Sequence, residues 1–192
     1  MIDAIKLTQD LIRRPSVTPV DAGAMDIVQE ALAGMGFVCH RMRFGEIENL
    51  YARFGTGYPA PFDTPCLGRK RWRLGDAAGL THFGVNLLRL PPGQWSSQRH
   101  WHSAEDEFSF VLEGEVVMVT DEGDQLMVAG DCAGFKAGVA NGHCFQNRSD
   151  TEAVLLEVGS RKPRTDACTY PDVDMAFAAG ASTYTHKDGT PF

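Results

Sequence analysis

The chain has 192 residues, a formal net charge of −7 and a hydrophobic content of 43%. The acidic balance disfavours a nucleic-acid partner, because binding to phosphates needs a basic surface, and the one basic cluster, residues 69–73, is expected to be a solvated strand edge or loop. No apolar run approaches the ~18 residues of a membrane-spanning helix, and the N-terminus lacks the basic start and apolar core of a secretory signal. We therefore expect a cytoplasmic protein with neither a nucleic-acid nor a membrane partner.

The first 57 residues have a different pattern from the rest of the chain. Apolar residues at helical spacing predict helices over residues 3–14 and 22–35, and two strands over residues 37–44 and 49–54 follow around a turn at Gly45. Helices of this length cannot bury their apolar faces alone, so this αα-ββ appendage is expected to pack on the rest of the chain or on a second subunit. Residues 55–65, rich in glycine and proline, form the expected linker.

Residues 58–192 form the second expected domain. Short strand candidates separated by turn signals follow Arg71, and the clearest cover residues 83–90, 108–112, 115–120, 125–128 and 153–158. This pattern is typical of an all-β sandwich or barrel. The remaining tail, from Arg161, contains prolines and many small residues, so we expect it to wrap along the outside of the barrel.

Two histidines and a carboxylate lie close together in the second domain. Only Trp101 separates His100 from His102, and residues i and i+2 of a strand project from the same face, so both imidazoles should point one way. A short polar turn follows, and Glu107 opens the returning strand. Imidazole nitrogen with one carboxylate oxygen suits Zn, Fe, Mn, Ni or Co. The alternative is that both histidines are solvated and that residues 105–107 form an acidic face.

A second region, residues 130–147 (GDCAGFKAGVANGHCFQN), is a glycine-rich turn that runs into His143. Together the two segments resemble the two motifs of the cupin superfamily, Gly…HxHx4Ex6G followed by G-x5-P-x-G…H…N. The matching residues are Gly93, His100, His102, Glu107 and Gly114, then Gly130, Gly138, His143 and Asn147. The first motif matches well, although six residues rather than five separate Gly93 from His100. The second departs from the pattern, because Lys136 stands where proline is usual and four residues, not two, separate Gly138 from His143.

The resemblance implies a mainly β fold, the cupin double-stranded β-helix or jelly-roll barrel, with the small α+β appendage at its N-terminus. It also implies one divalent metal ion per chain, Zn, Fe, Mn or Ni, with four ligands: His100, His102, Glu107 and His143. Cupin barrels commonly pair, and exposed edge strands give a barrel a physical reason to do so, so we expect a homodimer.

The appendage resembles a different family. Residues 7–57, which begin LTQDLIRRPS and end LYARFGTG, are similar to the extreme N-terminus of succinyl-diaminopimelate desuccinylase, a di-zinc amidohydrolase. In that family the metal ligands and the catalytic glutamate lie further on, beginning with a GHxDVV segment. This chain diverges after Gly57 and has no such segment, so no desuccinylase site residue is carried over.

Residues 58–192 also look like a bacterial group of small single-domain cupins, through YPAPF, RLGDAAGLTHFGVNLLRLPPG, SSQRHWHSAEDEF, GDCAGF, NRSD, LEVGSR and YTHKDGTPF. Cupins differ widely in their reactions, so this resemblance supports the fold and the metal site more than any activity. The preserved ligand set of the first motif favours a metalloenzyme that acts on a small, oxygen-rich molecule by oxygenase, isomerase or related lyase chemistry. The alternatives are a non-enzymatic binding or sensing module for a small molecule, and a barrel whose metal is only structural.

Four side chains are candidates for substrate binding near the mouth of the barrel. Strand parity suggests Gln98 and Ser109, and Arg89 is a candidate for contact with an anionic group. Phe145 shares the face of His143 and is expected to line the cavity, whereas Asn147 is expected to fix a turn.

Five cysteines are scattered without a CxxC pair, which favours reduced thiols over a disulfide framework. Cys144 is the only one that the sequence places near the expected site. Alternation along a strand turns its side chain away from that of His143, so we expect it to pack in the core.

Overall fold

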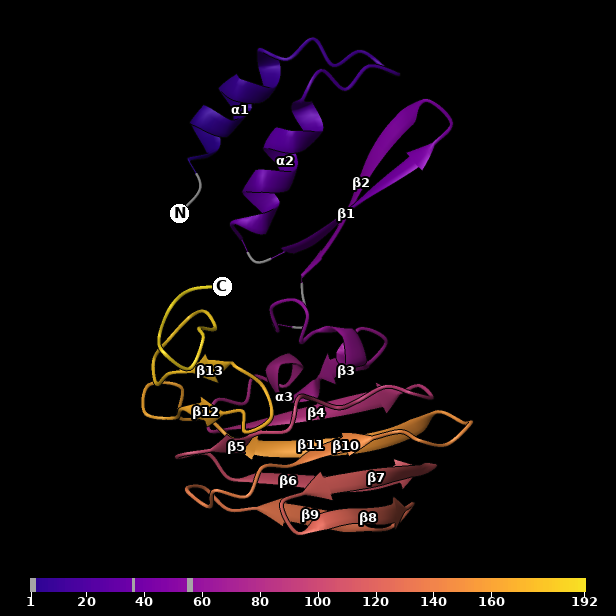
Figure 1. Cartoon of the computed structure of the whole chain (residues 1–192), viewed down its shortest axis with the longest axis vertical. Coiled ribbons are helices and arrows are strands. Elements are labelled where there is room, and N and C mark those ends of the chain that lie inside the picture. Colours follow the sequence, from indigo (N-terminus) through magenta and orange to yellow (C-terminus); the bar gives the residue numbers. More distant parts are fainter. Residues whose placement is uncertain (1–2, 36, 55–56) are drawn as a thin grey trace. The chain divides into compact units, whose positions relative to one another are not determined.

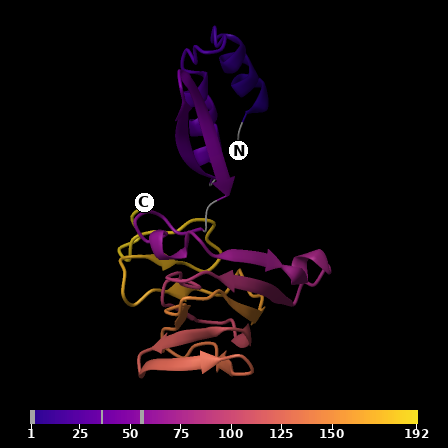
Figure 2. The ribbon, with the colours of Figure 1, turned by 90° about the vertical axis from the view of Figure 1, so that its right-hand side faces the viewer.

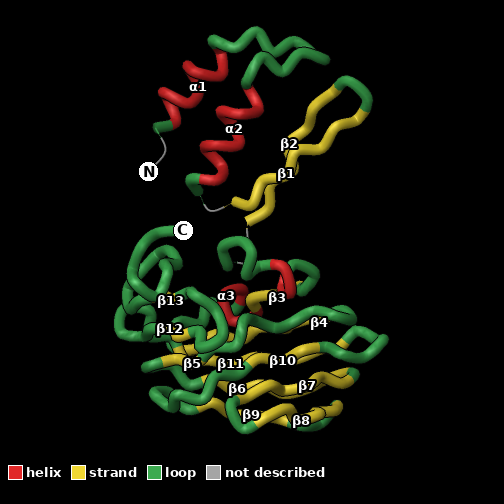
Figure 3. Tube along the Cα trace, viewed as in Figure 1, coloured by secondary structure: helices red, strands yellow, loops and turns green. Residues whose placement is uncertain are grey.

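The computed structural model describes residues 3–35, 37–54 and 57–192. The chain divides into two compact units, Met1–Gly57 and Tyr58–Phe192. Figure 1 shows helices and a hairpin in the first unit, and Figure 3 shows that the second is built almost entirely of strands and loops. The mainly β fold predicted from the sequence is confirmed. Among the described residues, no helix combines the length and apolar character needed to cross a bilayer.

The first unit consists of two helices and one hairpin: α1 (Ala4–Ile12), α2 (Ala24–Ala33), β1 (Phe37–Phe44) and β2 (Ile47–Phe54). Asp3 caps α1, because its carboxylate accepts hydrogen bonds of 3.0 Å from the backbone N–H groups of Ile5 and Lys6. The two strands pair along their whole length, and α2 packs against both of them. Neither helix has a buried residue, and Ile5 and Ile12 are 73% and 78% exposed. That their apolar faces pack on another surface stays a prediction.

The second unit contains a 3-10 turn (η1), a short helix (α3) and strands β3 to β13. Their bounds are η1 Thr64–Cys66, β3 Lys70–Arg73, α3 Leu74–Ala77, β4 Phe83–Leu90, β5 Trp101–His102, β6 Glu107–Glu113, β7 Glu115–Thr120, β8 Gly123–Val128, β9 Cys132–Phe135, β10 Cys144–Gln146, β11 Ala153–Ser160, β12 Cys168–Thr169 and β13 Ala176–Phe177. The five strands that the sequence marks most clearly are all present, with ends within two residues of the predicted ones.

The main core of the second unit lies between two antiparallel sheets. One has five strands in the order β3-β4-β11-β6-β9, and the other has three in the order β10-β7-β8. Both contribute buried side chains, namely Leu88, Leu90, Val111, Val116, Met127, Phe145, Ala153 and Leu155. Strand alternation decides which residues enter this core. In β4, Leu88 and Leu90 are fully buried, whereas Arg89 between them is exposed.

A second core cluster joins the segment after Gly57 to the C-terminal tail. Its buried members are Tyr58, Cys66, Cys168, Tyr170 and Met175. Figure 2 shows the tail (yellow) beside the segment that begins the second unit (purple), and β12 of the tail pairs with both β13 and β5. Two expectations are therefore corrected. Residues 58–65 pack into the unit instead of forming a free linker, and the tail is part of a core as well as an outer wrap. Residues 55 and 56 of the expected linker lie outside the described residues.

Asn147 links separate segments at the end of the main core, where it is 1% exposed. Its amide group donates to the carbonyl oxygens of Leu90 and Thr151, both at 2.7 Å. Its Oδ1 atom accepts from the backbone N–H and the hydroxyl of Ser149 at 3.0 and 2.8 Å. The expected turn at this asparagine thus ties the end of β4 to the connection between β10 and β11.

Replacing Asn147 by alanine is expected to lower the free energy of unfolding by about 3 kcal/mol, because buried carbonyl oxygens lose their donors. Urea denaturation followed by circular dichroism measures the change. Asp150→Ala is the matched control in the same turn, since Asp150 is exposed, and it should change stability by less than about 0.5 kcal/mol. Equal losses in the two variants would show that the hydrogen bonds of Asn147 have no special role.

Candidate metal centre

The backbone places His100 directly opposite His143. The N–H of His100 donates to the carbonyl of His143 at 3.1 Å, and the N–H of His143 donates to the carbonyl of His100 at 2.8 Å. Side chains of residues paired in this way lie on the same face of the ladder. The bridge therefore brings the two sequence motifs together, with the imidazole centroids 5.0 Å apart.

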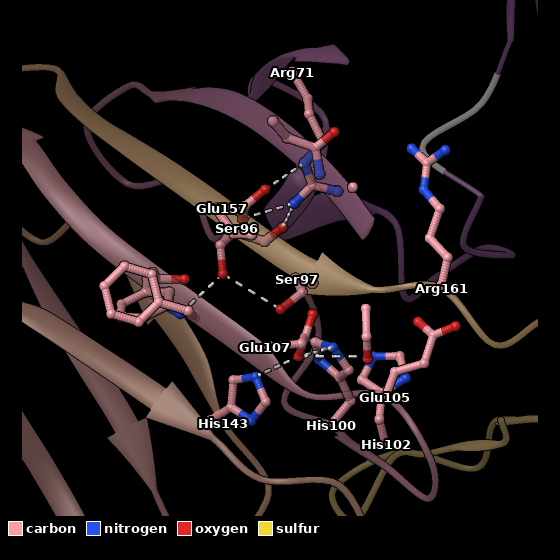
Figure 4. A pocket seen from close by; sticks show the side chains of 18 of the residues that line it. Arg71, Ser96, Ser97, His100, His102, Glu105, Glu107, His143, Glu157 and Arg161 are labelled. Atoms are coloured by element: carbon pink, nitrogen blue, oxygen red, sulfur yellow. Dashed lines mark hydrogen bonds and ion pairs between the residues drawn. The ribbon is translucent and has the colours of Figure 1, made fainter. Parts of the chain in front are cut away.

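His102 and Glu107 complete the cluster. His102 lies on β5, two residues beyond His100, and Glu107 is the first residue of β6. The Nε2 atoms of all three imidazoles approach one atom, Oε2 of Glu107, at 2.9 Å from His143, 3.6 Å from His100 and 3.7 Å from His102. The structure thus brings together the four residues that the sequence resemblance implies as metal ligands (Figure 4).

The remaining ring nitrogens set the tautomers of two imidazoles. Nδ1 of His100 lies 2.8 Å from the carbonyl oxygen of Gln98, and Nδ1 of His102 lies 2.6 Å from Oδ2 of Asp166. Because a carbonyl or carboxylate oxygen can only accept, each Nδ1 carries a proton, and in the neutral form of each ring Nε2 presents a lone pair to the cluster. Nδ1 of His143 is buried and has no hydrogen-bond partner among the described residues.

Asp166, in the C-terminal tail, holds the segment that bears His102. Its carboxylate is 8% exposed, and besides the contact with His102 it accepts from the backbone N–H groups of Ala104 and Glu105 at 2.8 and 3.1 Å. The hydroxyl of Ser103 also donates to it, at 3.5 Å. A buried carboxylate with this many donors is fixed in position, so it fixes the orientation of the His102 ring.

Charge and burial together shift the pKa values in the cluster. Burial alone would raise the pKa of the Glu107 carboxyl, but the hydrogen bond with His143 and the other imidazoles outweigh it and hold this pKa at about 2. Burial lowers the pKa of His100 to about 4. Burial also opposes protonation of His102, yet the negative charges of Glu107 and Asp166 raise its pKa above the ordinary value. At neutral pH, Glu107 is therefore anionic and His100 neutral, as metal ligation requires.

The spacing of these atoms fits a divalent ion. Ligand atoms bound to one ion at about 2.1 Å stand about 3.0–3.4 Å from one another, and the distances to Glu107 Oε2 range from 2.9 to 3.7 Å. Among the described residues, three groups have donor atoms that lie within 4.8 Å of one another inside each group: His100, Glu107 and His143; His100, His102 and Cys168; and His102, Glu105 and Asp166. The residues present can hold a metal ion.

A cavity of about 530 Å³ opens over the cluster. Imidazoles and Glu107 line one end, and Ser109 and Phe145 also face it. Figure 4 shows the guanidinium groups of Arg71 and Arg161 at the end of the cavity away from the imidazoles. The cavity therefore offers metal ligands at one end and cationic groups at the other.

Two of the four predicted substrate-binding residues line this cavity and two do not. Ser109 and Phe145 belong to its lining. Arg89 points away from the core, because Leu88 and Leu90 occupy the inner face of β4, and it forms an ion pair of 2.7 Å with Glu152. The Gln98 side chain donates to the carbonyl of Phe62 at 2.6 Å, outside the lining residues.

Sequence reasoning missed several residues around the site. Asp166 and Cys168 come from the tail, and Cys168 replaces Cys144 as the cysteine next to the imidazoles. Arg71 belongs to the basic cluster that we interpreted as a solvated edge, and Arg161 directly follows β11. The strand alternation of residues 70–73 was the available signal, because it puts Arg71 and Arg73 on one face.

Comparison with known proteins agrees with this geometry. The sequence pattern of the cupin domain matches residues 86–159. The chain is similar to the solved structure of a sugar phosphate isomerase from a cupin superfamily of Silicibacter pomeroyi, with 48% identity and a TM-score of 0.67 over 72% of this chain and 88% of that one. It is also similar to a provisionally assigned sugar phosphate isomerase of Acidithiobacillus ferrooxidans, with 29% identity and a TM-score of 0.57 over 62% and 77% of the two chains.

Curated relatives match a separate, short segment. The chain is 69% identical over 58 residues to a succinyl-diaminopimelate desuccinylase of Phenylobacterium zucineum, and 67% identical over 58 residues to one of Caulobacter vibrioides. Each match covers 30% of this chain and 15% of the relative, so the chain spans only a small part of the length of these enzymes. The partial resemblance to desuccinylases is confirmed.

The pair formed by Asp166 and His102 makes the stability of the metal-free protein depend on pH. Because the folded-state pKa of His102 is raised, the charged pair contributes fully below about pH 6.5 and its contribution is lost as the pH rises through the folded-state pKa. We therefore expect Asp166→Asn to destabilise the chelator-treated protein more at about pH 6 than at about pH 9. Urea unfolding measures the stability, and NMR titration of the His102 ring should give a lower pKa in the variant. An unchanged ring pKa would contradict this interpretation.

The same substitution is expected to weaken metal binding by about 10- to 100-fold, because the asparagine side chain orients the His102 ring less firmly. Competition with a chromophoric chelator measures the affinity. Asp172→Asn is the control, since Asp172 pairs with Arg99 at 2.6 Å and lies outside the donor groups. Equal metal affinity in Asp166→Asn and the wild type would exclude this positioning role.

Proposed function

The chain belongs to the cupin superfamily, and we propose that it is a metal-dependent isomerase acting on a small sugar-type substrate that carries a phosphate group. The observation that supports this proposal most directly is the convergence of three imidazole Nε2 atoms and one carboxylate at the end of a polar cavity. The similarity to a protein named as a sugar phosphate isomerase supports the choice of reaction.

In this proposal, His100, His102, His143 and Glu107 hold one divalent ion, either Zn, Fe, Mn or Ni. When bound by these residues, such an ion would supply Lewis-acid stabilisation of the negative charge that develops on the substrate oxygens. The chain prepares for this role by holding the proton of the neutral His100 and His102 rings on Nδ1, so that Nε2 is the atom of each ring that faces the ion.

Isomerisation of a hydroxy-aldehyde to a hydroxy-ketone also needs a base, which takes a proton from one carbon and returns it to the neighbouring carbon. Glu105 is the best-placed carboxylate, because it lines the cavity and has an oxygen atom within 4.8 Å of a His102 nitrogen. Burial raises its pKa, which makes it a stronger base. The backbone N–H of Lys162 donates to its Oε1 and holds it in place. Glu157 also lines the cavity, but Arg71 neutralises it through contacts of 2.9 and 3.0 Å.

A non-enzymatic binding module remains the alternative, because a chelating ligand would use the same metal end and the same cavity. Turnover separates the two functions, since a binding module takes up the ligand and returns it unchanged. The half-buried Glu105 in the cavity favours the isomerase, because a module that only binds has no need of a base.

We propose in addition that the chain forms a homodimer. The strand β8 lies at the edge of its sheet and exposes Leu126 and Val128, at 59% and 46%. An edge strand with apolar side chains favours pairing with a second copy. Multi-angle light scattering of the whole chain tests this, and a monomer at every concentration would contradict it.

Replacing Glu105 by glutamine is expected to lower kcat by about 10²- to 10⁴-fold, because the amide cannot accept the proton. The assay presents metal-loaded protein with phosphorylated aldoses and ketoses in deuterated water, and mass spectrometry follows both product and deuterium uptake at the carbon next to the carbonyl. Glu115→Gln, at an exposed position on β7, is the matched control. Full deuterium uptake by Glu105→Gln would refute its role, and ligand binding by the wild type without any turnover would establish the binding module instead.

A further inference from the structure

The cationic end of the cavity is built by strand alternation. Arg71 and Arg73 lie on the same face of β3, and Trp72 lies on the other. Both arginines line the cavity, and Arg73 stands opposite Asn86 of β4, which also lines it. Arg161 joins them from the residue directly after β11.

Two glycines form the floor of the cavity between the cationic end and the metal end. Gly84 of β4 pairs with Gly159 of β11, and Gly159 pairs in turn with Glu107 of β6. Both glycines line the cavity. Neighbouring strands lie about 4.8 Å apart, so the backbone of Gly84 is about 10 Å from that of Glu107. A small ligand can therefore lie over Gly159, with one end at the metal ligands and the other at the arginine side chain that covers Gly84.

Gly84 also makes room for the guanidinium group of Arg161. A Cβ atom at Gly84 would lie 3.3 Å from Nε and 3.4 Å from Nη2 of Arg161, which shows that the side chain lies closely over this glycine. Nη1 donates to the carbonyl of Leu80 at 3.2 Å, and Nη2 donates to Asp76. Two of the five N–H donors of this guanidinium group are thus used within the described part of the chain, and the others are available to a ligand.

The balance of charge at this end is positive. Arg71 is matched by Glu157, with which it forms a bidentate pair. Arg73 and Arg161 share the single carboxylate of Asp76, and Arg73 is only loosely attached to it, at 3.9 Å and with 72% of its side chain exposed. Among the ion pairs of the described residues, Asp76 is the partner of both arginines, so these two arginines carry one positive charge more than the carboxylate they contact.

We infer that Arg161, assisted by Arg73, binds the phosphate group of the substrate, while the reacting carbon atoms lie at the metal end. This inference rests on the proposed isomerase function and assigns the residues that recognise the substrate. A phosphate monoester presents several acceptor oxygens and up to two negative charges, which suits a planar guanidinium fork with open donors. Asp76 is a positioning residue, because it orients the Arg161 side chain over Gly84.

The test measures binding of inorganic phosphate to the whole chain by isothermal titration calorimetry. Arg161→Met removes the charge but keeps an apolar stem, and we expect it to weaken phosphate binding by about tenfold or more. Arg73→Met should weaken phosphate binding by about threefold, and because the Arg73 side chain is exposed we expect this variant to keep its fold. Arg148→Met is the control, since it removes an arginine paired with Asp124 outside the cavity and should leave phosphate binding unchanged.

A second measurement separates this inference from the proposed function. If the protein turns over a phosphorylated sugar, Arg161→Met should raise KM by about tenfold or more while kcat changes less. Phosphate binding that depends on Arg161 in a protein without turnover would uphold the anion site and refute the isomerase. Turnover together with unchanged phosphate affinity and KM in Arg161→Met would refute the anion site and leave the isomerase proposal intact.

If Arg161→Met does not fold, the Arg73→Met variant decides, because unchanged phosphate affinity in that variant refutes the inference. A wild-type protein that binds no phosphate also refutes it.

Discussion

The site depends on one constraint, namely that a carboxylate and three imidazoles share a small volume at the end of the cavity. Within the described part of the chain, Glu107 is the carboxylate that all three Nε2 atoms approach, and the rings of His100 and His143 are held side by side by their own backbone bridge. Neutral imidazoles with lone pairs aimed at an anionic oxygen repel it unless a cation or a proton lies between them. In the metal-free chain, the proton on Nε2 of His143 has this role through its 2.9 Å contact with Glu107. A divalent ion would satisfy all four residues at once.

The C-terminal tail stabilises this arrangement of imidazoles and carboxylate. The strand β12 pairs with β5. The carboxylate of Asp166 also accepts hydrogen bonds from the His102 ring and from two backbone N–H groups of the turn that follows it. The same tail buries Tyr170 and Met175 in the second core cluster, together with Tyr58 from the start of the unit. Folding of the tail is therefore coupled to the geometry of the metal ligands, although the tail contributes none of the four ligands itself.

The sequence predicts what is local and periodic, and it misses what depends on long-range packing. Alternation along a strand is enough to put His100 and His102 on one face, and the motif resemblance adds Glu107 and His143. Asp166 could not be found in this way, because its contact with His102 crosses 64 positions of sequence and depends on how the tail folds back. Arg89 was chosen for its charge, and its strand turns it away from the cavity. Gln98 was chosen by strand parity, which does not apply because the strand β5 begins only at Trp101. In the first unit, the helices and the hairpin can be predicted from local sequence patterns. The surface that covers the apolar faces of the two helices cannot be predicted in this way.

Elemental analysis is the most direct test of the central claim, that the three imidazoles and Glu107 form a metal site. The protein is purified without added metal and without a histidine tag, and the wild type is compared with His102→Ala. The account predicts near-stoichiometric zinc, iron, manganese or nickel in the wild type and loss of this metal in the variant, with both proteins folded by circular dichroism. Little metal in the wild type, even after reconstitution with each of these ions, would contradict it and leave a cavity that binds its ligand through protein groups alone.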